Sequence, residues 1–177
     1  MSEDWRVRVL FDETQIAKRN DEIAREIAAR KPKDLLVVAI LKGSFMFAAD
    51  LIRAMHRAGM APQVEFMHLS SYRAGTVSSG QVAILRDVDS DVNGKEVLLV
   101  DDILESGRTI AFAKDLLAAR GAKVESCVLL EKPGKRAVSI NPDFTGFTCP
   151  DLFVVGYGMD VAHAYRQLPF VGVVEKN

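Results

Sequence analysis

The chain has 177 residues, of which 49% are hydrophobic and 27% are charged, and its formal net charge is -1. This length suits one domain with a buried core, and the balanced charge excludes a broad basic field for binding nucleic acid or membranes. The two cysteines lack CxxC and zinc-ligand spacing, and the first residues lack the pattern of a signal peptide. No apolar run approaches the ~20 residues that span a bilayer. The sequence therefore predicts a single cytoplasmic domain, 1–177, that binds neither nucleic acid nor membrane.

The first half of the chain alternates between predicted helices and strands. Isoleucines spaced along one helical face predict a helix over 14–30, with Asp12 as its N-cap. The unbroken apolar run 34–41 predicts a strand buried on both faces, which is typical of a parallel sheet. A helix over 45–57 and a strand over 64–69 follow.

The second half of the chain begins with a predicted long loop over 70–80, because this stretch is small, polar and flanked by glycine. The remaining predicted elements are strands over 82–86, 96–100, 123–130, 152–155 and 170–174 and a helix over 108–120. This alternation predicts an α/β fold with a central, mostly parallel sheet and helices on both faces. Ligands bind beyond the carboxyl ends of the strands in such folds, so the loops that begin at Lys42, Asp101, Glu131 and Gly156 are candidates for the site.

A phosphate site is predicted where the apolar strand that ends at Val100 passes through a small-residue turn into a helix. Backbone amides at the start of a helix bind anions, and the helix dipole adds positive potential. Ser106 and Thr109 add hydroxyl donors, and Gly107 lets the backbone approach a ligand closely. The segment has the spacing of neither a Walker A loop nor a dinucleotide fingerprint.

Two adjacent acids, Asp101 and Asp102, precede this turn, where they would repel a phosphate. Their presence is explained if they accept hydrogen bonds from sugar hydroxyls, or if they hold a magnesium ion that offsets the charge. An isolated Asp-Asp pair is more often simply solvated. The position of this pair between a buried strand and a helix favours a role in a site.

Several stretches resemble a known family. Val-Leu-Leu-Val-Asp-Asp-Ile-Leu-Glu-Ser-Gly-Arg-Thr, over 97–109, is similar to the phosphoribosyl-diphosphate-binding signature of type I phosphoribosyltransferases. Other stretches resemble, in the same order along the chain, parts of hypoxanthine-guanine phosphoribosyltransferases: their first active-site loop in 40–51, their mobile catalytic loop with Ser71 and Tyr72, and their purine-binding end in 141–147, 153–160 and Arg166.

The resemblance implies the type I phosphoribosyltransferase fold, with a small hood built from the N-terminus and about 135–177. It implies an enzyme of purine salvage that moves ribose-5-phosphate from phosphoribosyl diphosphate to the 6-oxopurine bases hypoxanthine and guanine, giving IMP or GMP and diphosphate. It also implies a Mg²⁺ cofactor and a homodimer or homotetramer.

The resemblance also implies the contacts of the phosphates and the metal. The residues that would hold the 5′-phosphate are Ser106, Gly107, Arg108 and Thr109. Asp101 and Asp102 would face the ribose hydroxyls and the water shell of the metal. The diphosphate would be bound by backbone amides of Lys42 and Gly43, after a cis peptide bond between Leu41 and Lys42, and by Arg166. Asp160 would hold a second magnesium ion.

At the purine end, the resemblance implies a catalytic role for Glu105. It occupies a position where the family usually has Asp, and its carboxylate would take a proton from the N7 region of the purine. Lys132 would donate a hydrogen bond to the purine O6. Phe153 would stack on the base, and the backbone of Val154 would contact its N1 and C2 edge.

Two other functions remain open at this point. One is a transferase that prefers xanthine or guanine. The other is an RNA-binding regulator on the same fold, as in pyrimidine-operon attenuators, which resemble the chain over 101–109. Such a regulator would not need Lys132 with a downstream Phe153, and it should have a basic face, which a net charge of -1 does not indicate.

Overall fold

The computed structural model describes residues 5–74 and 77–176, with the side chains of 72–79 left outside the description. The main sheet has six strands, in the order β4 (Val77–Arg86), β3 (Gln63–Ala74), β2 (Leu35–Leu41), β5 (Glu96–Leu104), β6 (Lys123–Glu131) and β7 (Phe144–Thr148). All neighbouring pairs are parallel except β3 and β4. This confirms the predicted, mostly parallel sheet.

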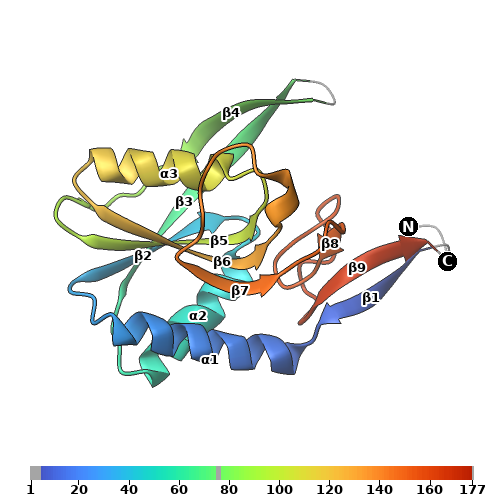
Figure 1. Ribbon diagram of the computed structural model, residues 1–177, viewed down its shortest axis with the longest axis horizontal. Coiled ribbons are helices and arrows are strands. Elements are labelled where there is room, and N and C mark those ends of the chain that lie inside the picture. Colours follow the sequence, from blue (N-terminus) through green and yellow to red (C-terminus); the bar gives the residue numbers. More distant parts are fainter. Residues whose placement is uncertain (1–4, 75–76, 177) are drawn as a thin grey trace.

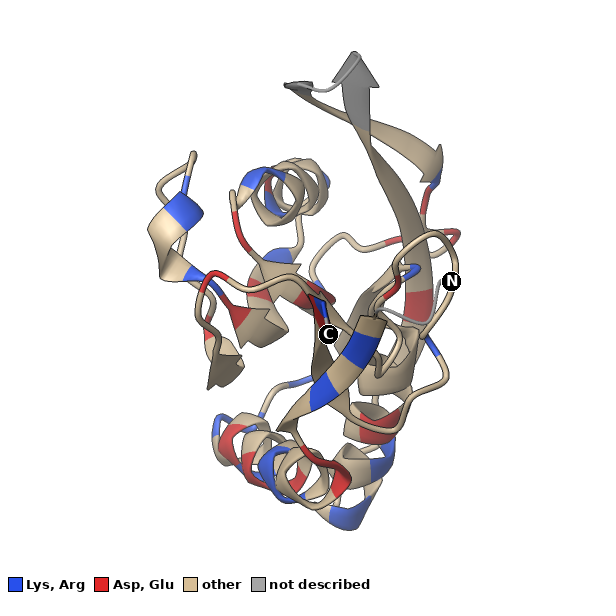
Figure 2. Ribbon diagram, turned by 90° about the vertical axis from the view of Figure 1, so that its right-hand side faces the viewer, with Lys and Arg blue, Asp and Glu red and all other residues tan. Residues whose placement is uncertain are grey.

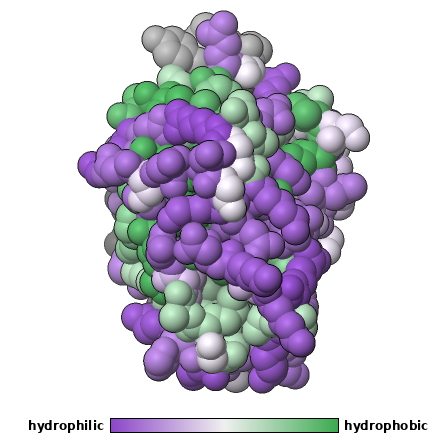
Figure 3. Space-filling model, turned by 90° about the vertical axis from the view of Figure 1, so that its left-hand side faces the viewer, coloured by the Kyte–Doolittle hydropathy of each residue, from purple (hydrophilic) through white to green (hydrophobic). Residues whose placement is uncertain are grey.

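Helices cover both faces of this sheet, as predicted (Figure 1). α1 (Glu13–Ala29) and α2 (Phe45–Arg57) pack with one set of sheet side chains, and α3 (Arg108–Ala119) packs with the other set. Asp12 is the predicted N-cap of α1 and accepts a hydrogen bond from the Gln15 amide at 2.8 Å. The surface shown in Figure 3 is mostly hydrophilic, which fits a sheet whose apolar side chains are buried between helices.

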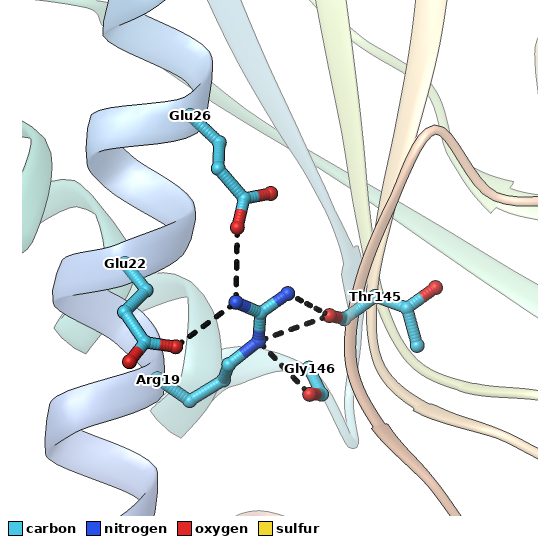
Figure 4. A network of polar contacts seen from close by, with 5 residues as sticks. All are labelled: Arg19, Glu22, Glu26, Thr145 and Gly146. Carbon is cyan, nitrogen blue, oxygen red and sulfur yellow. Dashed lines mark hydrogen bonds and ion pairs between the residues drawn. The ribbon is translucent and has the colours of Figure 1, made fainter.

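The edge strand β7 is fastened to α1 through Arg19 (Figure 4). Its guanidinium donates to the carbonyl oxygens of Thr145 and Gly146, at 2.7 and 3.0 Å. The same group pairs with Glu22 and Glu26, at 3.1 and 2.9 Å. Arg19 therefore satisfies backbone acceptors on a strand that has no further strand beside it.

A second, three-stranded sheet joins the two ends of the chain. Its order is β1 (Trp5–Phe11), β9 (Val171–Lys176) and β8 (Val154–Val155), and both pairings are antiparallel. β9 and β8 are the last two predicted strands, whereas β1 was not predicted. β7 falls within the range expected for the hood, yet it pairs with β6 in the main sheet. The division of the chain into one domain with a hood stays a prediction.

The prediction of a loop over 70–80 was wrong, because the described backbone of this stretch belongs to two strands. β3 extends to Ala74 and β4 begins at Val77, with Ser71 paired to Val82 and Arg73 to Ser78. Antiparallel backbone hydrogen bonds need no apolar face, so a polar stretch can continue a strand whose partner returns beside it. The side chain of Tyr72 lies outside the described residues. In the described part of the chain, no helix has the length and apolar character to cross a bilayer.

Candidate active site

A cavity of about 500 Å³ opens at the carboxyl ends of β2, β5 and β6, beside His68 and Leu69 in the middle of β3. In Figure 2, which views the molecule from the right of Figure 1, acidic and basic residues lie on neighbouring segments around the centre. The predicted site residues that line the cavity are Lys42, Gly43, Asp102, Glu105, Lys132, Phe153, Val154, Asp160 and Arg166. The predicted residues that do not line it are Asp101, Ser106, Gly107, Arg108, Thr109 and Ser71.

The acid pair lies on β5, which continues four residues beyond the predicted strand end at Val100. Asp101 is buried, and its Oδ1 accepts a hydrogen bond from the Asp102 amide at 2.9 Å. Burial raises the pKa of both carboxyls, and the neighbouring charge of Asp102 adds to the rise in the pKa of Asp101. A Cβ atom at position 43 would lie 1.8 Å from Asp102 Oδ2, so only glycine allows this contact between the two loops.

The predicted phosphate loop is held in place from outside the cavity. Gly107 precedes α3 with a φ of 83°, a left-handed conformation, and a Cβ atom there would lie 2.6 Å from Ile140 Cγ2. The amides of Ala137 and Val138 donate to the Ser106 carbonyl, at 2.8 and 3.2 Å. Arg136 donates to the Glu105 carbonyl at 2.9 Å. These contacts hold the loop before α3 in one conformation, and its anion binding stays a prediction.

The part of the cavity predicted to bind the purine combines an ammonium group, a carboxylate and an aromatic ring. The buried Lys132 donates to the Leu152 carbonyl through Nζ at 2.7 Å, and this Nζ lies 3.8 Å from Glu105 Oε1. Phe153 is 60% exposed, which is unusual for a phenylalanine and leaves its ring available to a ligand. Val154 is buried in β8 and pairs with Val173 of β9.

The turn after β2 and the segment around Asp160 also line the cavity. The peptide bond between Leu41 and Lys42 is cis, as the family resemblance implied. Asp160 Oδ1 lies 2.9 Å from Arg166 Nη2, and Arg166 Nη1 donates to the Gly158 carbonyl at 2.7 Å. A Cβ atom at position 158 would lie 2.4 Å from the Gly43 carbonyl oxygen, so these two backbones are in close contact.

Comparison with known proteins identifies the family. A family model described as the phosphoribosyl transferase domain matches residues 8–162. Hypoxanthine phosphoribosyltransferase of Escherichia coli is 42% identical over 172 residues, which are 95% of this chain and 95% of that protein. The chain belongs to the hypoxanthine phosphoribosyltransferase family. As a hypoxanthine phosphoribosyltransferase family member it is an enzyme of purine salvage.

Two further members of the hypoxanthine phosphoribosyltransferase family extend the comparison. The hypoxanthine-guanine phosphoribosyltransferase of Lactococcus lactis is 43% identical over 169 residues, covering 95% of this chain and 91% of that protein. The solved structure of hypoxanthine phosphoribosyltransferase from Trypanosoma cruzi, in complex with the product IMP, is 34% identical. It has a TM-score of 0.88 and covers 98% of this chain and 96% of that chain.

Three polar residues that line this cavity, His68, Lys135 and Asp151, were missed in the sequence. His68 pairs with Leu41, the last residue of β2, so its place near the end of the predicted strand 64–69 could have pointed to it. Lys135 lies between β6 and β7, whereas Asp151 lies between β7 and β8. Nothing in their sequence context indicates that the two side chains are in contact. Among the described residues, no three His, Cys, Asp or Glu side chains come together as a metal site.

Proposed function

We propose that the enzyme transfers ribose-5-phosphate from phosphoribosyl diphosphate to hypoxanthine or guanine, giving IMP or GMP, with magnesium as cofactor. The observation that carries the proposal is the order of groups along one cavity. Lys132 and Glu105 lie at one end, Asp102 lies on β5, and the turn at Lys42 lies on the other side of Asp102 across the sheet. This order matches a base, a ribose and a diphosphate in sequence.

The reaction needs a proton acceptor beside the base. The bond between the ribose C1′ and the diphosphate oxygen breaks, positive charge develops on the ribose, and a purine nitrogen forms the new bond to C1′. The purine releases a proton in this step, and we propose that the carboxylate of Glu105, which lines the cavity, accepts it. Lys132 Nζ donates to the purine O6, which draws electron density away from the ring as the proton leaves.

The carboxylates that line the cavity fit a metal that is held partly by substrate. Mg²⁺ in phosphate-transfer sites is commonly held by one or two carboxylates together with substrate oxygens and water, and not by a cage of protein ligands. Asp102 and Asp160 both line the cavity and could each contribute in this way, with Asp101 behind Asp102. Magnesium would supply positive charge for the leaving diphosphate. We propose that excess chelator abolishes turnover, and that Mg²⁺ or Mn²⁺ restores it.

The names of the relatives support the substrate assignment. The relatives from Escherichia coli and Lactococcus lactis carry the names of hypoxanthine and hypoxanthine-guanine phosphoribosyltransferase, and the Trypanosoma cruzi structure contains the product IMP. Lys132 is buried and offers only hydrogen-bond donors, so it matches the acceptor at O6 of a 6-oxopurine and not the amino group of adenine.

The test is turnover of phosphoribosyl diphosphate with hypoxanthine, guanine, xanthine and adenine in turn. We expect efficient use of hypoxanthine and guanine, and about 10⁴-fold lower kcat/KM for adenine, because a mismatched base leaves buried polar groups unpaired. Lys132→Ala should lower kcat/KM for the 6-oxopurines far more than it weakens binding of phosphoribosyl diphosphate. Comparable use of adenine would overturn the assignment of the base, and a preference for xanthine would favour the alternative named above.

A further inference from the structure

We propose that Lys135 is a positioning residue for Glu105, and that it holds the carboxylate in place when the purine occupies Lys132. This inference rests on the proposed function of Glu105 as the proton acceptor. Lys135 Nζ lies 3.6 Å from Glu105 Oε1, and the same oxygen lies 3.8 Å from Lys132 Nζ. One oxygen of the Glu105 carboxylate therefore lies near two ammonium groups. These groups belong to Lys132 and Lys135, the first and last residues of the segment 132–135.

The two lysines differ in what binding of a base requires of them. Lys132 is 9% exposed at its side chain, and its Nζ already donates to the Leu152 carbonyl. When it also donates to a purine O6, less of its hydrogen-bonding capacity is left for Glu105, because an ammonium group has three donors. Lys135 is not needed to bind the base, so its attraction for Glu105 persists in the complex with substrate.

The position of Lys135 is itself restrained. It ends a single 3-10 turn, Pro133–Lys135, which directly follows Lys132. Its Nζ lies 2.8 Å from Asp151 Oδ1, and this partner raises the pKa of Lys135, which keeps the ammonium charged. Asp151 belongs to the segment that also carries Phe153. The pair thus joins the two connections that border the purine end, with Glu105 beside it.

The length of Glu105 makes a restraint of this kind necessary. A glutamate has one more rotatable bond than the aspartate usual in the family, and its side chain here is 43% exposed. An unrestrained carboxylate on the longer side chain would spend less time at the purine nitrogen, and proton transfer depends on a close approach. Contact with the exposed Lys135 is a modest interaction, so we expect a modest effect on rate.

The experiment compares Lys135→Met with Lys135→Arg, and uses Lys123→Met as a matched control. Lys123 is another exposed lysine, at the start of β6, with its Nζ 3.4 Å from Glu96 Oε1. We expect Lys135→Met to lower kcat by about 3- to 5-fold with the KM for phosphoribosyl diphosphate unchanged. Lys135→Arg should restore most of the rate, and Lys123→Met should match the wild type.

A double variant separates a role through Glu105 from a general effect on the site. If Lys135 acts through the carboxylate, Lys135→Met should cause no further loss in an enzyme that already carries Glu105→Gln. Wild-type kcat for Lys135→Met, or an equal loss in both backgrounds, would overturn the inference. Full activity of Glu105→Gln would instead remove the proposed role of Glu105 itself, so the two failures can be told apart.

Discussion

Glu105 is the residue on which the proposed chemistry depends most directly. Its carboxylate lines the cavity beside the buried ammonium of Lys132, while Arg136 holds its backbone carbonyl. We predict that Glu105→Gln lowers kcat by roughly 100-fold, because the amide cannot accept the proton while its size and hydrogen bonds are similar. Steady-state kinetics and direct binding of phosphoribosyl diphosphate would separate rate from affinity. Turnover close to that of the wild type would exclude Glu105 from the proton transfer.

Asp101 is predicted to reduce the stability of the protein without ligand. Because its pKa is raised in the folded state, the folded protein holds the proton more tightly than the unfolded chain does. Stability is therefore lost as the pH rises through the folded pKa, where a buried charge must form. We predict that Asp101→Asn raises the melting temperature at pH 7 by a few degrees, about 1–2 kcal/mol, and that the gain disappears in acid. An equal gain at all pH values would contradict this explanation.

Sequence reasoning at the scale of residues succeeded where the groups lie next to one another in the chain. Asp102 lies on β5, and Glu105 and the predicted phosphate loop directly follow this strand, so their proximity is set by local geometry. Lys135 and Asp151 meet only because the connection after β6 and the segment before β8 border the same cavity. No local sequence pattern indicates that Lys135 and Asp151 are in contact.

At the scale of elements, strong periodicity or unbroken apolar runs were decisive. They located α1, α2, β2 and β5, whose buried faces are continuous in the sequence. β1 alternates apolar residues with arginine, and its partner β9 lies at the far end of the chain, so nothing nearby indicated a pairing. The extension of β3 and β4 was missed for a different reason. Its two strands are close in the sequence, but their small and polar residues are typical of a loop.

This extension is predicted to respond to substrates. A two-stranded ribbon is only marginally stable by itself. The backbone of Gly80 in this ribbon lies close to the guanidinium of Arg108, which is next to the predicted phosphate site. We predict that the amides of Ser71 and Val82, which belong to one paired position, exchange hydrogen faster in the free enzyme than in the complex with both substrates. Hydrogen-exchange mass spectrometry can measure this difference. The amides of β2 serve as the control, and equal exchange of the ribbon in both states would contradict the prediction.

At the scale of the whole molecule, the two sheets divide the site between them. The predicted phosphate loop and the turn at Lys42 follow strands of the main sheet, whereas Val154 lies in β8 of the small sheet. β8 has only two residues and is paired to β9 through Val154 with Val173 and Val155 with Gly172. β9 is in turn paired to β1 along its length. The first strand of the chain therefore supports a cavity wall, predicted to contact the purine, that lies more than a hundred residues away.

Removal of β1 should consequently weaken binding of the base in particular. We predict that deletion of residues 1–11, which keeps Asp12 as the N-cap of α1, raises the KM for hypoxanthine by roughly tenfold, about 1.4 kcal/mol of binding free energy. The KM for phosphoribosyl diphosphate should change much less, because its predicted contacts come from β2 and β5 and the loops that follow them. Titration of each substrate with the wild type and with the truncated enzyme measures both KM values. A parallel rise in both KM values would mean that the small sheet supports the whole domain, and an unchanged KM for hypoxanthine would mean that β8 holds its position without β1.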